Sequence, residues 1–293
     1  MKFLVFGSLN IDLIFSVDHI VCPGETINSS ALERSAGGKG ANQAAALAKA
    51  GMEVYMAGKI GHDGDFLLEL LQSYGVRTNH IMHWEGATGQ ALIQVDKTGQ
   101  NSIVLYGGGN AALKDSEVPA IISSFSAGDI VLLQNEIPVS AAVMRTARER
   151  GMKVCLNPSP FDERIADLPL ELADILFVNE IEAAGLTGLP ASQDFETVLE
   201  KLAGRFPKTE IILTAGKEGA FYALGTLRAK GDIVDLPVAD TTGAGDTFSG
   251  FFLAARERGC DVTESLRLAC KASSIAVSRK GAMASMPFAG EVF

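Results

Sequence analysis

A carboxylate follows three residues with little or no side chain in the segment Thr241-Thr242-Gly243-Ala244-Gly245-Asp246. Apolar residues at helical spacing come next, so the pattern predicts a turn that opens into a helix. The first N–H groups of a helix have no intrahelical partner, and small residues let an anion approach them. Asp246 could then take a proton from a hydroxyl that attacks a bound phosphate. The same pattern also fits an acid that merely stabilises a helix N-terminus.

Two further segments carry groups suited to binding a polyol. Asn10 and Asp12 follow the first predicted strand, two positions apart, and would share one side of an extended chain. Alternatively, Asn10 and Asp12 have no binding role and are ordinary turn residues after a strand. The segment 37–42 surrounds Lys39 with three glycines and ends at Asn42, and it fits neither a Walker loop nor a dinucleotide-binding motif. A tight turn before a helix explains the glycines but leaves Lys39 and Asn42 unexplained.

Polar residues also follow the later predicted strands. Glu136 offers an acceptor directly after the strand 131–134. Asn179 and Glu182 lie three apart on one face of a starting helix, where an amide and a carboxylate can hold a hydrated Mg²⁺. The alternative is an acid that stabilises the N-terminus of that helix.

A cation site is a further hypothesis near the C-terminus. The turn 281–285 follows a predicted helix that carries Ala276 and Arg279. Together with Asp240 and Thr242, this turn could surround a monovalent cation with oxygen atoms. Composition alone does not require that interpretation.

Composition restricts the function classes. The chain has 293 residues, 47% hydrophobic and 20% charged, as in an ordinary globular enzyme. A formal charge of −10 argues against a nucleic-acid partner, which needs clustered Lys and Arg. No apolar run reaches the roughly 18 residues that span a bilayer, and the apolar N-terminus is too short for a signal peptide. The four cysteines lack metal-ligand spacing, so we expect reduced thiols in a cytoplasmic protein.

Strands and helices alternate along most of the chain. Strands are predicted at 1–7, 13–17, 54–57, 130–133, 153–156, 175–178 and 210–214, and helices at about 41–49, 63–74, 140–150 and 195–205. This alternation predicts an α/β fold with a mainly parallel central sheet and helices on both faces. Ligands of such sheets bind outside the carboxyl ends of the strands, where the polar residues above fall.

A hairpin interrupts this alternation. Apolar and polar residues alternate from 91 to 96, a turn follows at 97–100, and a second strand runs from 101 to 106. With the extended residues near the N-terminus, the hairpin would form a small second sheet that acts as a flap. We therefore expect one folding unit over 1–293, with a β flap inserted from about 12–36 and 88–108.

In this order, the segments resemble the ribokinase-like (PfkB-type) carbohydrate kinase family along essentially the whole chain. The stretches Gly-Gly-Lys-Gly-Ala-Asn-Gln at 37–43 and Asp-Thr-Thr-Gly-Ala-Gly-Asp at 240–246 carry the resemblance. It implies transfer of the γ-phosphate of MgATP to a primary sugar hydroxyl, with O5 of D-ribose as the expected acceptor. It also implies activation by K⁺ and a homodimer, because flap strands of this family commonly pair between subunits.

The resemblance further implies a role for each matching residue. Asp246 is the expected base, and the expected anion hole consists of the N–H groups of Gly243, Ala244 and Gly245. The expected sugar ligands, besides Asp246, are Asn10, Asp12, Gly38, Lys39, Asn42 and Glu136. The expected nucleotide-binding residues are Asn179, Thr214, Gly216 and Gly245, with Glu182 for Mg²⁺. The expected K⁺ site, mostly of backbone oxygens, comprises Asp240, Thr242, Ala276, Arg279, Gly281 and Ser285.

The chain departs from the family pattern in two places. The helix that should border the adenine pocket carries Cys270, Lys271 and Ser273 instead of a recognisable polar contact, and the chain ends at Phe293, before the additional helix of many relatives. The preferred nucleotide is therefore left open. The alternatives are a kinase for another pentose, a hexose or a nucleoside, and a catalytically silent sugar- or nucleotide-binding regulator. A dehydrogenase is disfavoured by the missing dinucleotide motif.

Overall fold

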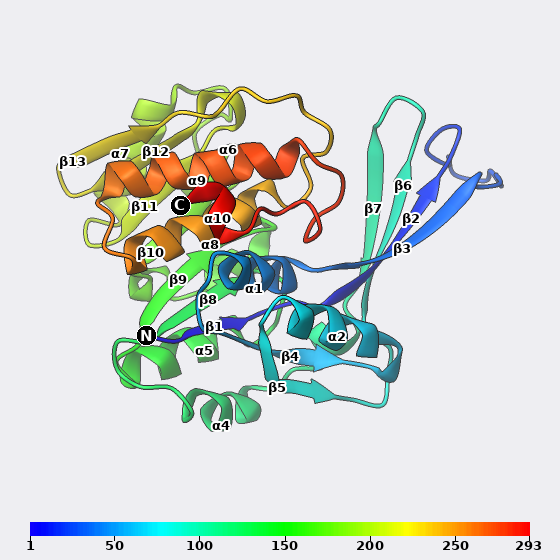
Figure 1. Cartoon of the computed structure of the whole chain (residues 1–293), viewed down its shortest axis with the longest axis horizontal. Helices are drawn as coiled ribbons and strands as arrows, with labels where there is room; N and C mark the ends of the chain where they lie inside the picture. The colour runs from blue at the N-terminus through cyan, green and yellow to red at the C-terminus, as the bar shows by residue number, and fades with distance from the viewer.

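The computed structural model describes all 293 residues and contains two sheets (Figure 1). The main sheet has nine strands in the order β13-β12-β11-β10-β9-β8-β1-β4-β5. Neighbours from β5 to β11 run parallel, whereas β11–β12 and β12–β13 pair antiparallel. The strands are β1 (Phe3–Phe6), β4 (Val54–Ile60), β5 (Arg77–His83), β8 (Ile130–Gln134), β9 (Lys153–Asn157), β10 (Ile175–Asn179), β11 (Glu210–Thr214), β12 (Ala220–Leu224) and β13 (Leu227–Gly231).

Helices cover both faces of this sheet, because its central strands are apolar on both sides. In β1, Leu4 and Phe6 belong to one core cluster, and Phe3 and Val5 belong to the other. The first cluster packs under α4 (Val118–Ile122), α5 (Ser140–Glu149), α6 (Glu180–Thr187) and α7 (Phe195–Arg205). The second packs under α1 (Lys39–Lys49), α2 (Asp65–Ser73), α8 (Ala244–Glu257) and α9 (Val262–Val277).

Short helical segments complete the chain. The single-turn helices are α3 (Gly108–Ala111) and α10 (Ala289–Val292), and the 3₁₀ turns are His62–Gly64, Asp115–Glu117, Glu163–Asp167, Leu170–Leu172 and Gly216–Glu218. No helix is both long and apolar enough to cross a bilayer.

The second sheet, here called the flap, projects from the main body in Figure 1. Its strands are ordered β3 (Ala31–Gly37), β2 (Asn10–Ser16), β6 (Gly89–Val95) and β7 (Asn101–Tyr106). β6 and β7 form the expected antiparallel hairpin, while β2 pairs antiparallel with β3 and parallel with β6. Together with the mainly parallel main sheet, this confirms the predicted fold class.

Four details differ from the sequence prediction. β5 was not predicted, because its residues show no apolar alternation. The edge hairpin of β12 and β13 was missed as well, since only the short 3₁₀ turn Gly216–Glu218 separates it from β11. β2 begins at Asn10 instead of position 13, so Asn10 and Asp12 lie within an extended strand, as their sugar-binding interpretation expected, and not in a turn. Arg279 lies beyond α9, which ends at Val277 and whose C-cap is Ser278.

Candidate active site

Asp246 lies in the first turn of α8, behind the N-cap Gly243, and only 7% of it is exposed. Gly243 has φ 74°, a left-handed conformation that favours glycine. The Asp246 Oδ2 accepts a hydrogen bond from Asn42 Nδ2 at 3.0 Å, and Oδ1 accepts one from Gln43 Nε2 at 2.9 Å. Two amides at the start of α1 therefore orient this carboxylate.

Glycines allow α1 to begin where it does. Gly38, its N-cap, has φ 94°, and a Cβ added to Gly40 would lie 2.5 Å from the backbone nitrogen of Ser8. The Ala41 N–H donates to the Ser8 carbonyl at 2.9 Å. Only glycine permits such a close approach of the helix to the end of β1. The segment 37–40 therefore forms the tight turn before a helix that its glycines predict. The same turn places Asn42 beside Asp246.

Gln43 is a residue of this site to which the sequence analysis gave no role, although it belongs to the matching stretch 37–43. Its Nε2 contacts Asp246 and lies 3.3 Å from Asn157 Oδ1, while its Oε1 accepts a bond from Gln134 Nε2 at 2.6 Å. Gln134 ends β8 and Asn157 ends β9. Gln43 therefore connects the carboxyl ends of two central strands to Asp246.

The expected sugar ligands gather where β2 leaves the main body. The Glu136 Oε2 accepts a hydrogen bond from the Lys39 N–H at 3.1 Å and another from the Ser8 hydroxyl. Asp12 lies against Gly37, where a Cβ would be 2.1 Å from a carboxylate oxygen of Asp12.

Asn10 has a buried amide partner. Its Oδ1 accepts from Asn110 Nδ2 at 2.7 Å, and Asn110 Oδ1 accepts from the Leu9 N–H. Sequence reasoning gave no role to Ser8 or Asn110, because no motif joins Ser8 to Glu136, 128 positions away, or Asn110 to Asn10, 100 positions away.

Burial sets the charge state of these groups. It raises the pKa of Asp12 to about 7, with a further contribution from the negative charge of Glu136. Burial also raises the pKa of Glu136. Two effects oppose each other at Lys39. Burial lowers its pKa, but the negative charges of Asp246, Glu136 and Glu182 outweigh burial, so the pKa of Lys39 is raised overall. The ammonium group of Lys39 is therefore the cation shared by this cluster of acids.

A cavity of about 250 Å³ opens at the N-terminus of α8 and the carboxyl ends of β9, β10 and β11. It brings together predicted residues from four separate segments, namely Lys39, Asn179, Glu182, Thr214, Gly243, Ala244, Gly245 and Asp246. Gly216 lies in the 3₁₀ turn after β11 and is not among the residues that line this cavity.

Asn179 and Glu182 cap the N-terminus of α6, as the alternative to Mg²⁺ binding predicts. The Asn179 Oδ1 accepts from the N–H groups of Ile181 and Glu182, and the Glu182 Oε2 accepts from the Asn179 N–H at 2.7 Å. Glu182 is only 3% exposed, and burial raises its pKa. A carboxylate that burial disfavours is stabilised by a nearby cation, and Mg²⁺ prefers oxygen ligands and retains waters. The pair therefore fits a hydrated Mg²⁺ as well as a cap.

Asp240 joins the two loops expected to hold K⁺. Its Oδ1 accepts from the N–H and hydroxyl of Thr242, and its Oδ2 accepts from the Gly281 N–H at 3.0 Å. Burial acts against the charge of Asp240, but these hydrogen bonds lower its pKa overall. The Arg279 side chain pairs with Glu291, which leaves only backbone oxygen for a cation.

The remaining expected K⁺ ligands are already engaged within their own turns. The Ala276 carbonyl accepts from the Arg279 N–H at 3.0 Å, and the Ser285 hydroxyl donates to the Ala282 carbonyl at 2.8 Å. A carbonyl oxygen has two lone pairs, so such a bond leaves it able to coordinate a cation.

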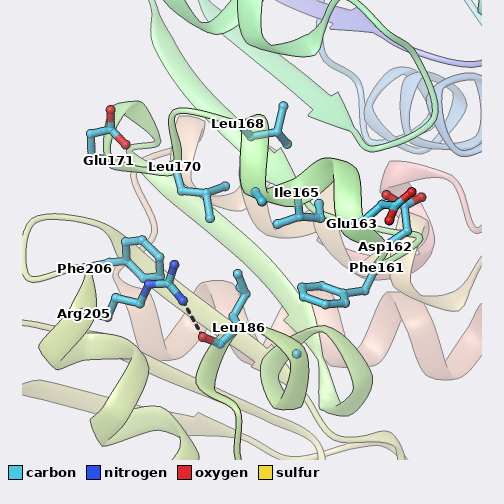
Figure 2. A pocket seen from close by; sticks show the side chains of 12 residues that line it. Phe161, Asp162, Glu163, Ile165, Leu168, Leu170, Glu171, Leu186, Arg205 and Phe206 are labelled. Atoms are coloured by element: carbon cyan, nitrogen blue, oxygen red, sulfur yellow. Dashed lines mark hydrogen bonds between the residues drawn. The ribbon is translucent and has the colours of Figure 1, made fainter.

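A larger cavity of about 620 Å³ lies elsewhere, between the segment 161–171 and helices α6 and α7 (Figure 2). Figure 2 shows its largely apolar lining, including Phe161, Ile165 and Leu186, with Arg205 bonded to the Leu186 carbonyl. None of the predicted site residues lines it. We therefore do not assign this cavity as the active site, although it is larger than the one at the N-terminus of α8.

Comparisons with known proteins agree with this geometry. Residues 1–289 match the family described as pfkB family carbohydrate kinase. A ribokinase of Haemophilus influenzae is 36% identical over 294 residues, which cover 97% of this chain and 94% of that protein. A bifunctional ribokinase/ribose-5-phosphate isomerase A of Fructilactobacillus sanfranciscensis is 36% identical over 295 residues, and the match covers 98% of this chain but only 54% of that longer protein.

Solved structures extend the likeness to three dimensions. The structure of Arabidopsis thaliana ribokinase complexed with ribose and ATP superimposes with a TM-score of 0.90 at 33% identity, covering 99% of this chain and 97% of that one. The family match spans nearly all residues, and the relatives share more than 30% identity over almost the whole chain. The chain therefore belongs to the pfkB family of carbohydrate kinases.

Proposed function

We propose that this protein is a ribokinase, which transfers the γ-phosphate of MgATP to O5 of D-ribose. One observation carries the proposal: Asp246 is held by Asn42 and Gln43 at the N-terminus of α8. There it adjoins both the expected sugar ligands and the cavity of about 250 Å³. The named activity of the relatives, and the ribose and ATP in the Arabidopsis complex, support the same substrates.

The chemistry follows from this position. Asp246 accepts the proton of the O5 hydroxyl as O5 attacks the γ-phosphorus, and the bond between that phosphorus and the β–γ bridging oxygen breaks. The products are ribose 5-phosphate and ADP. The N–H groups of Gly243, Ala244 and Gly245 stabilise the charge that develops on the phosphoryl oxygens. Asn179 and Glu182 would hold Mg²⁺, which supplies charge neutralisation to the phosphates.

Sugar selection rests on polar groups fixed before the sugar binds. Asn42 Oδ1 is buried and has no hydrogen-bond partner, so a sugar hydroxyl would satisfy it. Asn10, Asp12, the Gly38 backbone, Lys39 and Glu136 supply the other contacts. A pocket of this kind strongly rejects analogues that lack a hydroxyl, because a buried polar group then stays unpaired.

The proposal includes the assembly of the protein. Six large apolar side chains of the flap are exposed in a single chain, namely Leu32, Leu92, Ile103, Val104, Leu105 and Tyr106. The strand pairing puts Leu32, Leu92, Val104 and Tyr106 on one face of the flap. Exposed apolar side chains gathered on one face are typical of an interface, so we assign this face to a homodimer formed through the flap. We further assign one folding unit to 1–293, with the flap as an insertion, and a cytoplasmic location, in accord with four free thiols.

ADP release with a sugar panel tests the proposed function. With MgATP and K⁺ present, we expect kcat/KM to be highest for D-ribose among pentoses, hexoses and adenosine. 2-Deoxyribose should be a poorer substrate, because it leaves one buried group unpaired. A higher value for another sugar or for a nucleoside would contradict ribose as the substrate. No ADP release with any acceptor would indicate a silent binding protein.

Replacement of the base gives a second prediction. Asp246→Asn should lower kcat by about 10²–10⁴, as expected for loss of a general base. Ribose affinity, measured by calorimetry, should change little. The matched control is Asp235→Asn, an exposed aspartate outside the site, which should keep full activity. Near-normal turnover of Asp246→Asn would exclude its role as the base.

Potassium should activate the enzyme. At equal ionic strength, we expect a higher kcat in KCl than in NaCl or in buffer alone, because K⁺ would order the loops that Asp240 joins next to the anion hole. Asp240→Asn should reduce the difference between the two salts. Identical rates in all three solutions would argue against the cation site.

Ribose binding should depend on pH through Asp12, whose pKa is raised to about 7 by burial and by Glu136. Sugar hydroxyls donate to the ionised carboxylate, and below pH 7 a proton competes with them. The dissociation constant should therefore be about tenfold higher at pH 6 than at pH 8, with one proton released on binding near pH 6. Calorimetry in buffers of different ionisation enthalpy measures both, and Asp12→Asn should abolish the dependence. Equal affinity at both pH values would contradict this assignment.

A further inference from the structure

Two histidines and an aspartate meet at the edge of the main sheet, apart from the site described above. His62 begins the 3₁₀ turn after β4, Asp65 begins α2, and His83 ends the edge strand β5. The His83 Nε2 lies 2.6 Å from Asp65 Oδ1, and the two imidazole rings stack with centroids 5.1 Å apart. One potential ligand atom from each residue lies within 4.8 Å of the other two.

This set of side chains suits a transition metal. We propose that His62, Asp65 and His83 bind one divalent ion of the Zn²⁺ class. Two imidazole nitrogens and one carboxylate oxygen are ligands that zinc prefers, with water in a fourth, tetrahedral position. Mg²⁺ prefers oxygen ligands, so two imidazoles disfavour it. All three side chains are exposed, so they can adjust to the bond lengths around an ion.

The position of the site gives the ion a structural consequence. Asp63, inside the same turn, accepts hydrogen bonds from the N–H and the hydroxyl of Thr88 at 2.9 and 2.7 Å. Thr88 directly precedes β6 of the flap. The carbonyl of Asp63 also accepts a bond from Arg34, which belongs to β3 of the flap.

The same turn therefore anchors two flap strands to the main body. An ion bound by His62, Asp65 and His83 fixes this turn to the end of β5 and restrains the base of the flap. Neither the site nor this restraint depends on the proposed ribose chemistry.

Calorimetric titration with ZnCl₂ tests the binding. All proteins carry Cys22→Ser, which removes the exposed thiol as a competing ligand. We expect one zinc ion per chain in otherwise unchanged protein, and at least a tenfold loss of affinity in His62→Ala and in His83→Ala. Excess MgCl₂ should not compete. These residues are exposed, so neither variant should impair folding, which circular dichroism checks.

The matched control is His19→Ala. His19 also pairs with a carboxylate, Glu25, at 2.8 Å, but it is not part of a cluster with a second imidazole. Zinc affinity should be unchanged in this variant. A flat titration, equal loss in His19→Ala, or full binding in His62→Ala and His83→Ala would each overturn the proposed site.

Hydrogen exchange tests the restraint on the flap. Zinc should slow amide exchange in residues 84–90 of the protein with intact ligands, and it should have no effect there in His83→Ala. Equal exchange with and without zinc, at a concentration that saturates the site, would overturn the coupling to the flap.

Discussion

The contact between the first turns of α1 and α8 is the constraint on which the site depends. Asp246 receives one amide hydrogen bond from Asn42 and another from Gln43, in a buried region where such bonds are strong and an unpaired partner is costly. The two helices approach closely, since a Cβ on Gly250 would lie 2.6 Å from Ala46 Cβ. If these helices moved slightly apart, the Asp246 carboxylate would lose its hydrogen bonds to Asn42 and Gln43 and would change its orientation.

Electrostatics add a second constraint. Asp12, Glu136, Glu182 and Asp246 supply four acids to a region in which Lys39 is the cation that three of them share. The chain as a whole is also acidic, so no general positive field attracts a nucleotide. In the proposed function, the N-terminus of α8 and bound cations would therefore have to hold the negative phosphate groups. This imbalance is the physical reason for including Mg²⁺ and K⁺ in the proposed function.

Residues that belong to a local sequence motif were easier to predict than residues whose role depends on contacts with distant parts of the chain. The stretches 37–43 and 240–246 pointed to Asn42 and Asp246 because their glycines and spacing are specific, and the structure places these two side chains in hydrogen-bond contact. Gln43 belongs to the first stretch, but the sequence does not predict its role, since its bonds reach Gln134 and Asp246, which are 91 and 203 positions away. The edge strands β5 and β12–β13 were missed because local alternation does not mark them. Asn179 and Glu182 cap α6, and they are also the proposed Mg²⁺ ligands, so no sequence pattern separates these two roles.

The edge strand β7 has a practical consequence. Ile103, Val104, Leu105 and Tyr106 follow one another along the strand, so both of its faces are apolar, and all four residues are exposed in a single chain. An uncovered edge strand of this composition can pair with strands of other chains. Left uncovered, this strand therefore makes the chain liable to adsorb to apolar surfaces and to aggregate, and a strand of another molecule paired along it would remove that liability.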